Sequence, residues 1–178
     1  MKFFNGKDVD FLWAILPKLK PMKVYEGDPL YNQGDHAEEV FFIMKGRVKF
    51  YCDVSEEDLQ SINVPFILYV EGSCFGDSDV LLNHGKDGRD STAIADEEAQ
   101  LFYITKKELD KILKEFELVK REMTKVAQNR RDNHQMLIEQ AIKKARQQKR
   151  EQLGLPPIES EQKSETNEGS IIKEVDEE

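Results

Sequence analysis

Residues 76–92 contain the groups that a compact anion requires when a protein binds it away from water. Burying one negative charge takes a cation and several hydrogen-bond donors. Arg89 can supply the cation and a planar fork of N–H donors. If a helix begins at Gly76, the backbone N–H groups of this residue and the next two can point at the same anion. The candidate residues of this segment are Gly76, Asp77, Ser78, Arg89, Asp90, Ser91 and Thr92.

These candidate residues also have ordinary structural explanations. Arg89 could be a solvated loop arginine, Gly76 a turn glycine and Asp77 the cap of the short helix. Other chemistry has less support, because the three histidines are far apart and the two cysteines form no C-x-x-C motif. No serine-histidine-aspartate signature or Walker-type phosphate loop occurs either. We therefore predict that the chain is not an enzyme and has no metal or cofactor.

Length, composition and charge narrow the class of protein. The chain has 178 residues, of which 39% are apolar and 34% charged, which indicates one domain with appendages. No apolar run approaches the roughly 20 residues that cross a bilayer, and the N-terminus lacks the apolar stretch of a signal peptide. Two cysteines favour a reducing compartment. The net charge of -9 argues against nucleic acid as a partner.

Charge divides the chain into an acidic body, a basic helix and an acidic tail. Residues 1–117 carry a net charge of -9, residues 118–153 carry +6 and residues 154–178 carry -6. Gly154 and Pro156 separate the last two parts, since glycine favours a helix end and proline cannot continue a helix. The polar, acidic composition of the tail predicts disorder.

The body, residues 22–105, is expected to be an antiparallel β-roll of the jelly-roll kind. Short segments rich in Val, Ile, Phe and Tyr alternate with turns rich in Gly and Asp. The expected strands are 22–26, 39–45, 47–53, 64–70, 91–96 and 100–105.

Helices are expected on both sides of this β-roll, which makes an α+β fold. Within residues 1–21, a helix capped by Asp8 should run to Leu19. Residues 106–153 should form two helices. The second should dock on the body as far as about Leu137, and its basic end should be frayed or project into solvent. Its end is basic through Lys143, Lys144, Arg146, Lys149 and Arg150. This end could contact an anionic membrane or an acidic partner, or it could be a solvated face that complements the helix dipole and the acidic tail.

The order of the turn residues resembles the cyclic nucleotide-binding domain. Residues 24–51 contain the sequence G-D, G-D, F-F-I, G, V, which is similar to the first half of that domain. Residues of about 72–95 are similar to the family's phosphate-binding cassette: F-G-D, a short helix, an arginine and then S-T-A-I-A. The resemblance covers roughly residues 4–137.

The resemblance implies a role for each candidate residue. Arg89 and the cassette N–H groups would hold the cyclic phosphate, and the carboxylate of Asp77 would accept a hydrogen bond from the ribose 2′-hydroxyl. The last helix would cover the purine, because Arg130, His134 and Leu137 share one of its faces. Arg130 and His134 could instead be ordinary surface residues of a basic helix.

Three departures from the family pattern bear on affinity. Asp77 is one methylene shorter than the family's glutamate, and its spacing to Arg89 is three residues longer than usual. Asp90 stands where the family has a neutral residue, and a carboxylate about 5 Å from a phosphate repels it by roughly 1–3 kcal/mol. Lys86 could offset that repulsion.

The flanking segments resemble one branch of the family. Residues 3–28 and 120–134 are similar to the segments that open and close the nucleotide-binding domain of hyperpolarisation-activated, cyclic-nucleotide-gated and ether-à-go-go-type ion channels. We therefore predict a regulatory module that binds cyclic AMP or cyclic GMP as ligand and couples its occupancy to the last helix. The module would lie on the cytoplasmic side as a domain of a membrane channel, next to its transmembrane region and linker. It would be homo-oligomeric only within the full channel.

Two alternatives remain open at this point. The domain could have lost nucleotide binding and serve as a channel assembly or protein-interaction element. It could also be a nucleotide sensor unrelated to a channel, with its basic helix end engaging a partner.

Overall fold

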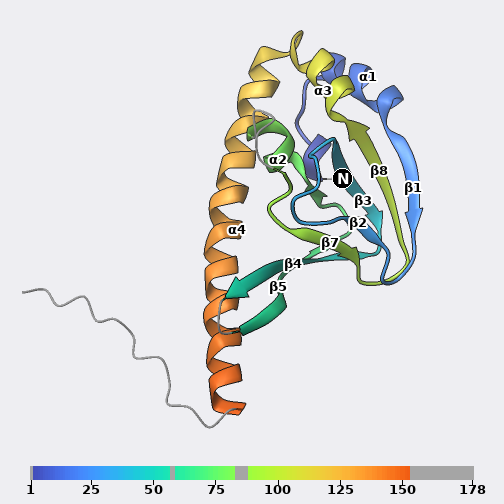
Figure 1. Cartoon of the computed structure of the whole chain (residues 1–178). Coiled ribbons are helices and arrows are strands. Elements are labelled where there is room, and N and C mark those ends of the chain that lie inside the picture. Colours follow the sequence, from blue (N-terminus) through green and yellow to red (C-terminus); the bar gives the residue numbers. More distant parts are fainter. Residues whose placement is uncertain (1, 57–58, 83–87, 153–178) are drawn as a thin grey trace, which may run out of the picture.

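The structure, a computed structural model, describes residues 2–56, 59–82 and 88–152. In these residues two four-stranded antiparallel sheets pack together, with strand orders β1-β8-β3-β6 and β2-β7-β4-β5 (Figure 1). The strands are β1 (Lys20–Val24), β2 (Pro29–Tyr31), β3 (Glu39–Lys45), β4 (Arg47–Glu56), β5 (Leu59–Val70), β6 (Cys74–Phe75), β7 (Thr92–Ala95) and β8 (Ala99–Thr105). The helices are α1 (Val9–Ile15), α2 (Asp77–Leu82), α3 (Lys106–Leu113) and α4 (Glu117–Gln152), with 3₁₀ turns at Lys2–Phe4 and Leu16–Lys18.

This arrangement confirms the predicted β-roll with helices at both ends. Two predicted features fall outside the described residues. They are the disordered tail, residues 154–178, and the loop that contains Lys86.

Strand β3 is buried on both faces and joins the two halves of the core. Successive side chains of a strand point to opposite faces. Phe41 and Ile43 therefore pack between the two sheets, in a cluster that also contains Phe50 and Phe75. Their neighbours along the strand, including Phe42, pack instead against the helices.

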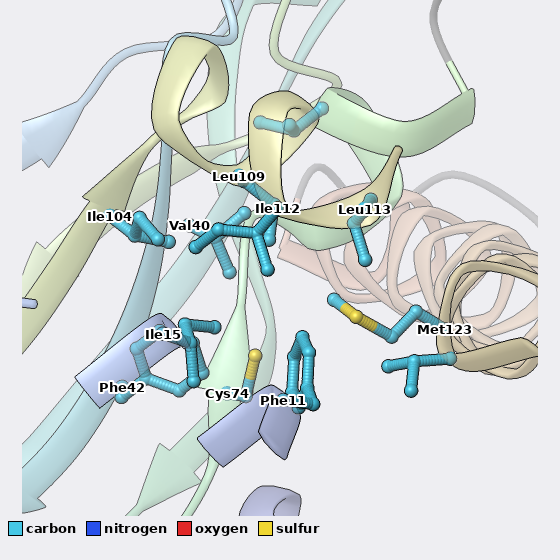
Figure 2. Close-up of a cluster of buried hydrophobic side chains, with 12 residues drawn as sticks. Phe11, Ile15, Val40, Phe42, Cys74, Ile104, Leu109, Ile112, Leu113 and Met123 are labelled. Carbon is cyan, nitrogen blue, oxygen red and sulfur yellow. The ribbon is translucent and has the colours of Figure 1, made fainter. Parts of the chain in front are cut away.

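The second half of the core lies between β3 and the helices. Figure 2 shows Phe11 of α1, Leu113 of α3 and Met123 of α4 converging on the side of the sheet that carries Phe42. Local sequence signals start these helices where they are needed. The side chain of Asp8 accepts hydrogen bonds from two N–H groups in the first turn of α1. In α3, the Thr105 side chain accepts a hydrogen bond from the Glu108 N–H and donates one to the Glu108 carboxylate.

The N-terminal helix is shorter than the sequence predicts. α1 ends at Ile15, and the chain continues as a 3₁₀ turn over Leu16–Lys18 because Pro17 has no N–H group to donate to an α-helical hydrogen bond. β1 then begins at Lys20 and includes Pro21, which an edge strand tolerates. The expected list of strands also lacked β2 and β6, which have only three and two residues and lie among turn residues.

Helix α4 runs alongside the whole β-roll, past α2 and on to the β4–β5 hairpin (Figure 1). Its buried residues are Val119, Met123, Ala127 and His134, which lie on one face. The last fully buried position, His134, agrees with docking as far as about Leu137, and the basic end stays helical to Gln152. None of the described helices combines the length and the apolar character that crossing a bilayer requires.

Candidate functional site

The buried polar residues of the described chain gather in one region. Their side chains are at most 8% exposed, and they are Asp77, Ser78, Asp79, Arg89, Ser91, Thr92 and His134. Six of them belong to the predicted cassette, and His134 lies on α4, which packs against α2 and β5. Burying charged groups is unfavourable unless they are paired. A domain that concentrates such groups at one place therefore has a candidate binding site there.

Arg89 is the largest buried side chain in this region. Its guanidinium donates hydrogen bonds to the carbonyl oxygens of Gly76 (3.1 Å) and Glu39 (2.7 Å) and pairs with a carboxylate oxygen of Asp79 at 3.3 Å. The guanidinium also stacks over the Tyr31 ring, with 4.2 Å between its central carbon and the ring centroid. The Nε–H group has no acceptor although it is buried. Arg89 is therefore a fixed internal cation with one donor to spare, and the alternative of a solvated loop arginine is wrong.

The backbone around Arg89 is fixed by the turn at Gly34. The Arg89 N–H donates to the Asp35 carbonyl (2.7 Å), and the Gly34 N–H donates to the Arg89 carbonyl (2.8 Å). Gly76 faces the other side of the guanidinium with a φ of +78°, and a Cβ there would lie 2.8 Å from an Arg89 nitrogen. Glycine is thus required at Gly76 both for its left-handed backbone and for space.

Asp79 is the weak partner of this arginine. It is 2% exposed, and one of its two carboxylate oxygens has no hydrogen-bond partner. Burial, together with the Asp90 carboxylate, raises the pKa of Asp79 to about 7, although Arg89 acts in the opposite direction. At neutral pH the carboxyl group of Asp79 is therefore protonated in a substantial fraction of molecules, and Arg89 is then left with the more distant Glu39 carboxylate, at 3.8 Å, as its counter-charge.

Two arginines connect α4 to the start of α2. Arg130 forms an ion pair with the buried carboxylate of Asp77, and Arg131 donates to the Ser78 carbonyl at 3.4 Å. Although burial lowers the pKa of Arg130, the Asp77 carboxylate raises it above the ordinary value overall. The sequence predicted Asp77 and Arg130 as separate ligand contacts. In the structure the two side chains contact each other.

His134 lies one helical turn after Arg130 and packs into the β-roll. Its Nε2 is 2.6 Å from the hydroxyl oxygen of Tyr69 on β5, and its ring lies among those of Phe50 and Phe66. The alternative of a surface histidine is therefore wrong, since the residue is 4% exposed. Burial lowers the pKa of His134, with Arg130 adding to the effect and the Asp90 and Asp77 carboxylates opposing it.

The remaining candidates have smaller roles in the described geometry. The Thr92 hydroxyl accepts a hydrogen bond from the Gln33 N–H (3.0 Å), and Ser91 donates to the Asp90 carboxylate at 3.3 Å. Leu137 is partly buried on α4. Sequence reasoning missed four residues that shape the site, which are Tyr31, Glu39, Tyr69 and Asp79. Among these four, the sequence pointed to Asp79 alone, because it follows Asp77 and Ser78 as the third polar residue of the cassette helix.

A cleft of about 420 Å³ lies between the N-terminal segment, β6 and α4, and Arg89 is not among the residues that line it. Tyr69, Asp77 and Arg130 lie in its wall. The arrangement thus offers a buried cation, a pair of carboxylates and a helix held over them by ion pairing. No group of three or more His, Cys, Asp or Glu suited to a metal ion occurs in residues 2–56, 59–82 and 88–152.

The comparison with known families decides the class. The model of the cyclic nucleotide-binding domain matches residues 21–116, which is more than half of the chain. The chain belongs to the cyclic nucleotide-binding domain family. It is accordingly a cyclic nucleotide-binding regulatory domain by family, and Arg130 and His134 lie on α4, beyond the matched segment. No curated protein matches the chain in sequence.

Solved structures share the fold of this cyclic nucleotide-binding domain. The catabolite activator protein of Thermus thermophilus superposes with a TM-score of 0.60 at 20% identity, covering 88% of this chain and 74% of that one. The regulatory domain of Toxoplasma gondii protein kinase A, solved with cAMP, gives 0.60 at 14% identity and covers 71% of this chain and 45% of that one. The c-di-GMP-responsive regulator CLP of Xanthomonas campestris gives 0.59 at 13% identity, with 78% and 64% coverage. The channel resemblance of the flanks has no counterpart among these three.

The buried histidine leads to a first prediction. Because burial lowers the pKa of His134, its contribution to stability is complete above the unfolded-state pKa of about 6.5 and is lost as pH falls below it. The free energy of unfolding should therefore fall more steeply between pH 7 and 5 for the wild type than for His134→Gln, measured by urea unfolding. The raised pKa of Asp79 makes the free energy of unfolding change in the opposite direction over this pH range. The contribution of His134 is therefore the difference between the slopes of wild type and His134→Gln. The exposed His36, changed to Gln, is the control for loss of a histidine as such. Equal slopes for wild type and His134→Gln would exclude a buried neutral His134.

Proposed function

We propose that this chain senses a cyclic nucleotide whose phosphate is held by Arg89 and by the N–H groups at the start of α2. The observation that carries the proposal is the fully buried guanidinium of Arg89, which has an unpaired Nε–H and a weak counterion in Asp79. A cation kept in this state stabilises the fold poorly by itself. A phosphate monoanion at the same place would gain charge-assisted hydrogen bonds.

The remaining parts of the ligand would meet groups that already connect α4 to the cassette. The carboxylate of Asp77 is the proposed acceptor for the ribose 2′-hydroxyl, and Arg130 and His134 would contact the purine. Since Asp77 is now paired with Arg130, ligand entry has to loosen or share this pair. In this proposal α4 has two positions, one with the Asp77–Arg130 pair closed and one with it loosened. The ligand binds one of these positions more tightly than the other, and that difference in affinity shifts the helix.

The second candidate is a domain that no longer binds nucleotide and serves in assembly. One observation favours it: Arg89 and Asp77 both already have protein partners of opposite charge. Amide hydrogen exchange separates the two candidates. With cyclic AMP or cyclic GMP present, the sensor should show altered protection in α2 and around Arg130 and His134, whereas an assembly domain should show the same protection with and without nucleotide.

Asp90 provides a prediction about affinity. Its carboxylate lies near enough to raise the pKa of Asp79, so it should also repel a phosphate at Arg89. Replacing Asp90 with Thr should tighten nucleotide binding by about tenfold to a hundredfold, which corresponds to roughly 1–3 kcal/mol. Fluorescence competition measures this, with the exposed Asp53→Thr as the matched control. Weaker binding by Asp90→Thr would show that Asp90 makes a favourable contact with the ligand.

We further propose that the domain works within a membrane channel, on the cytoplasmic side. The similarity of residues 3–28 and 120–134 to channel segments supports this context. In it, α4 would pass ligand occupancy to the transmembrane region through a linker, and copies of the domain would associate only in the assembled channel. An antibody against the domain should detect a polypeptide larger than 20.7 kDa in the membrane fraction of native cells. A 20.7 kDa polypeptide confined to the soluble fraction would contradict the channel context.

A further inference from the structure

Asp79 and Arg89 form a buried ion pair that is incomplete on both sides. Their charged atoms are 3.3 Å apart, and both residues are 2% exposed. The Oδ1 atom of Asp79 accepts no hydrogen bond, and the Nε–H of Arg89 donates none. Two orphaned polar atoms within a single ion pair are unusual, because buried polar groups are nearly always paired. The pair therefore has one acceptor and one donor available for a further partner.

The ionisable groups around Asp79 would carry more negative than positive charge if a ligand phosphate were bound at Arg89. The groups that face it or its partner are Arg89 and Asp90 from the cassette, Glu39 from β3, Arg131 from α4 and the phenol of Tyr31 from β2. Three carboxyl groups therefore share two arginines. A phosphate at Arg89 would add a fourth negative charge to this set, and Asp79 is the carboxyl most deeply buried among them.

We propose that Asp79 is the internal counterion of Arg89 that the ligand phosphate replaces, so that binding of cyclic nucleotide is coupled to uptake of one proton from solvent by the Asp79 carboxylate. This inference rests on the proposed function. The carboxylate becomes a neutral carboxylic acid, no other bond forms or breaks, and the guanidinium charge is then balanced by the phosphate.

The titration range of Asp79 makes this coupling effective near neutral pH. Burial raises the pKa of Asp79 to about 7. In the ligand-free domain the Asp79 carboxyl group is therefore mostly protonated at pH 6 and mostly ionised at pH 8. A phosphate beside Arg89 raises that pKa further, since a like charge disfavours the ionised form. If the bound domain stays protonated throughout, linkage gives an affinity about tenfold higher at pH 6 than at pH 8.

Isothermal titration calorimetry with cyclic AMP and cyclic GMP at pH 6 and pH 8 tests the coupling. Wild-type protein and the control Asp110→Asn, whose carboxylate is exposed on α3, should both bind about tenfold more tightly at pH 6. Asp79→Asn keeps the shape of the side chain without its charge, so its affinity should be independent of pH and close to that of the wild type at pH 6.

The number of protons taken up can be measured on the wild type alone, so the test does not depend on a variant that folds. Repeating the titration at pH 7 in buffers with different ionisation enthalpies should show net uptake of a substantial fraction of one proton. Binding without proton uptake, or an equal pH dependence in wild type and Asp79→Asn, would overturn the coupling and leave the proposed function standing. Absence of nucleotide binding by wild type and Asp79→Asn at both pH values would overturn the proposed function and the coupling together.

Discussion

Arg89→Ala is expected to weaken cyclic nucleotide binding by about 2–4 kcal/mol, or roughly thirtyfold to a thousandfold, through loss of a charge-assisted contact. The structure adds a second effect, because Arg89 is buried and donates to the carbonyls of Gly76 and Glu39. Its removal takes one donor from each of these carbonyls and leaves the buried Asp79 carboxylate without its arginine. We therefore expect a further loss of about 3–5 kcal/mol in the free energy of unfolding, reduced where Asp79 can take up a proton.

The two effects of Arg89 can be separated by experiment. Arg89→Lys keeps the charge but loses the planar fork, so it should fold more stably than Arg89→Ala and still bind nucleotide weakly. Arg47→Ala is the control, because that arginine pairs with Asp96 and Glu97 at the surface and should contribute less than about 1 kcal/mol. Urea unfolding and calorimetry measure the two quantities. Unchanged affinity in Arg89→Ala would remove Arg89 from the ligand site, and unchanged stability in Arg89→Ala would contradict the buried network.

Arg130→Ala is expected to loosen α4 from the cassette. The change leaves the Asp77 carboxylate buried without its cation, which should lower the free energy of unfolding by about 2–4 kcal/mol, the low end of what breaking a buried ion pair gives, because Arg130 is partly exposed. Amide exchange in α4 should speed up most around residues 127–137, where the helix is docked.

A double-mutant cycle separates the ion pair from other roles of Arg130. Asp77→Asn removes the buried charge, so Arg130→Ala made in that background should have a much smaller effect on stability than it has alone. Arg121→Ala, whose exposed side chain pairs with Glu117 one turn away, serves as the control on α4. If the two changes at Arg130 and Asp77 were additive, the pair would not be what holds α4 on the cassette.

The ordered turn residues explain why the sequence predicted the fold so well. The Gly34–Asp35 turn hydrogen-bonds the backbone of Arg89, so these turn residues and the cassette arginine are parts of one structure. A Cβ at Gly88 would lie 2.3 Å from the Gly34 carbonyl, which fixes glycine there as well. Local patterns of this kind are visible in a sequence because each position tolerates few residue types.

The partners of the site residues could not be predicted in the same way. Asp77 and Arg130 are 53 residues apart, and Tyr69 and His134 are 65 apart, so nothing local connects them. Glu39 contacts Arg89 mainly through a backbone carbonyl, which carries no residue-type signal. Tyr31 lies on β2, a three-residue strand whose pattern is too short to recognise. The sequence therefore identified the candidate residues, and only the packing of α4 on α2 showed that they neutralise one another.

The most direct test of the central claim is a calorimetric titration of this chain with cyclic AMP, cyclic GMP and the acyclic control 5′-AMP. We predict saturable binding of at least one cyclic nucleotide at one site per chain, with affinity strongly reduced in Arg89→Lys and not in Arg47→Ala. No saturable heat with either cyclic nucleotide, at protein concentrations that would detect millimolar binding, would contradict the account and identify the domain as a non-binding member of its family.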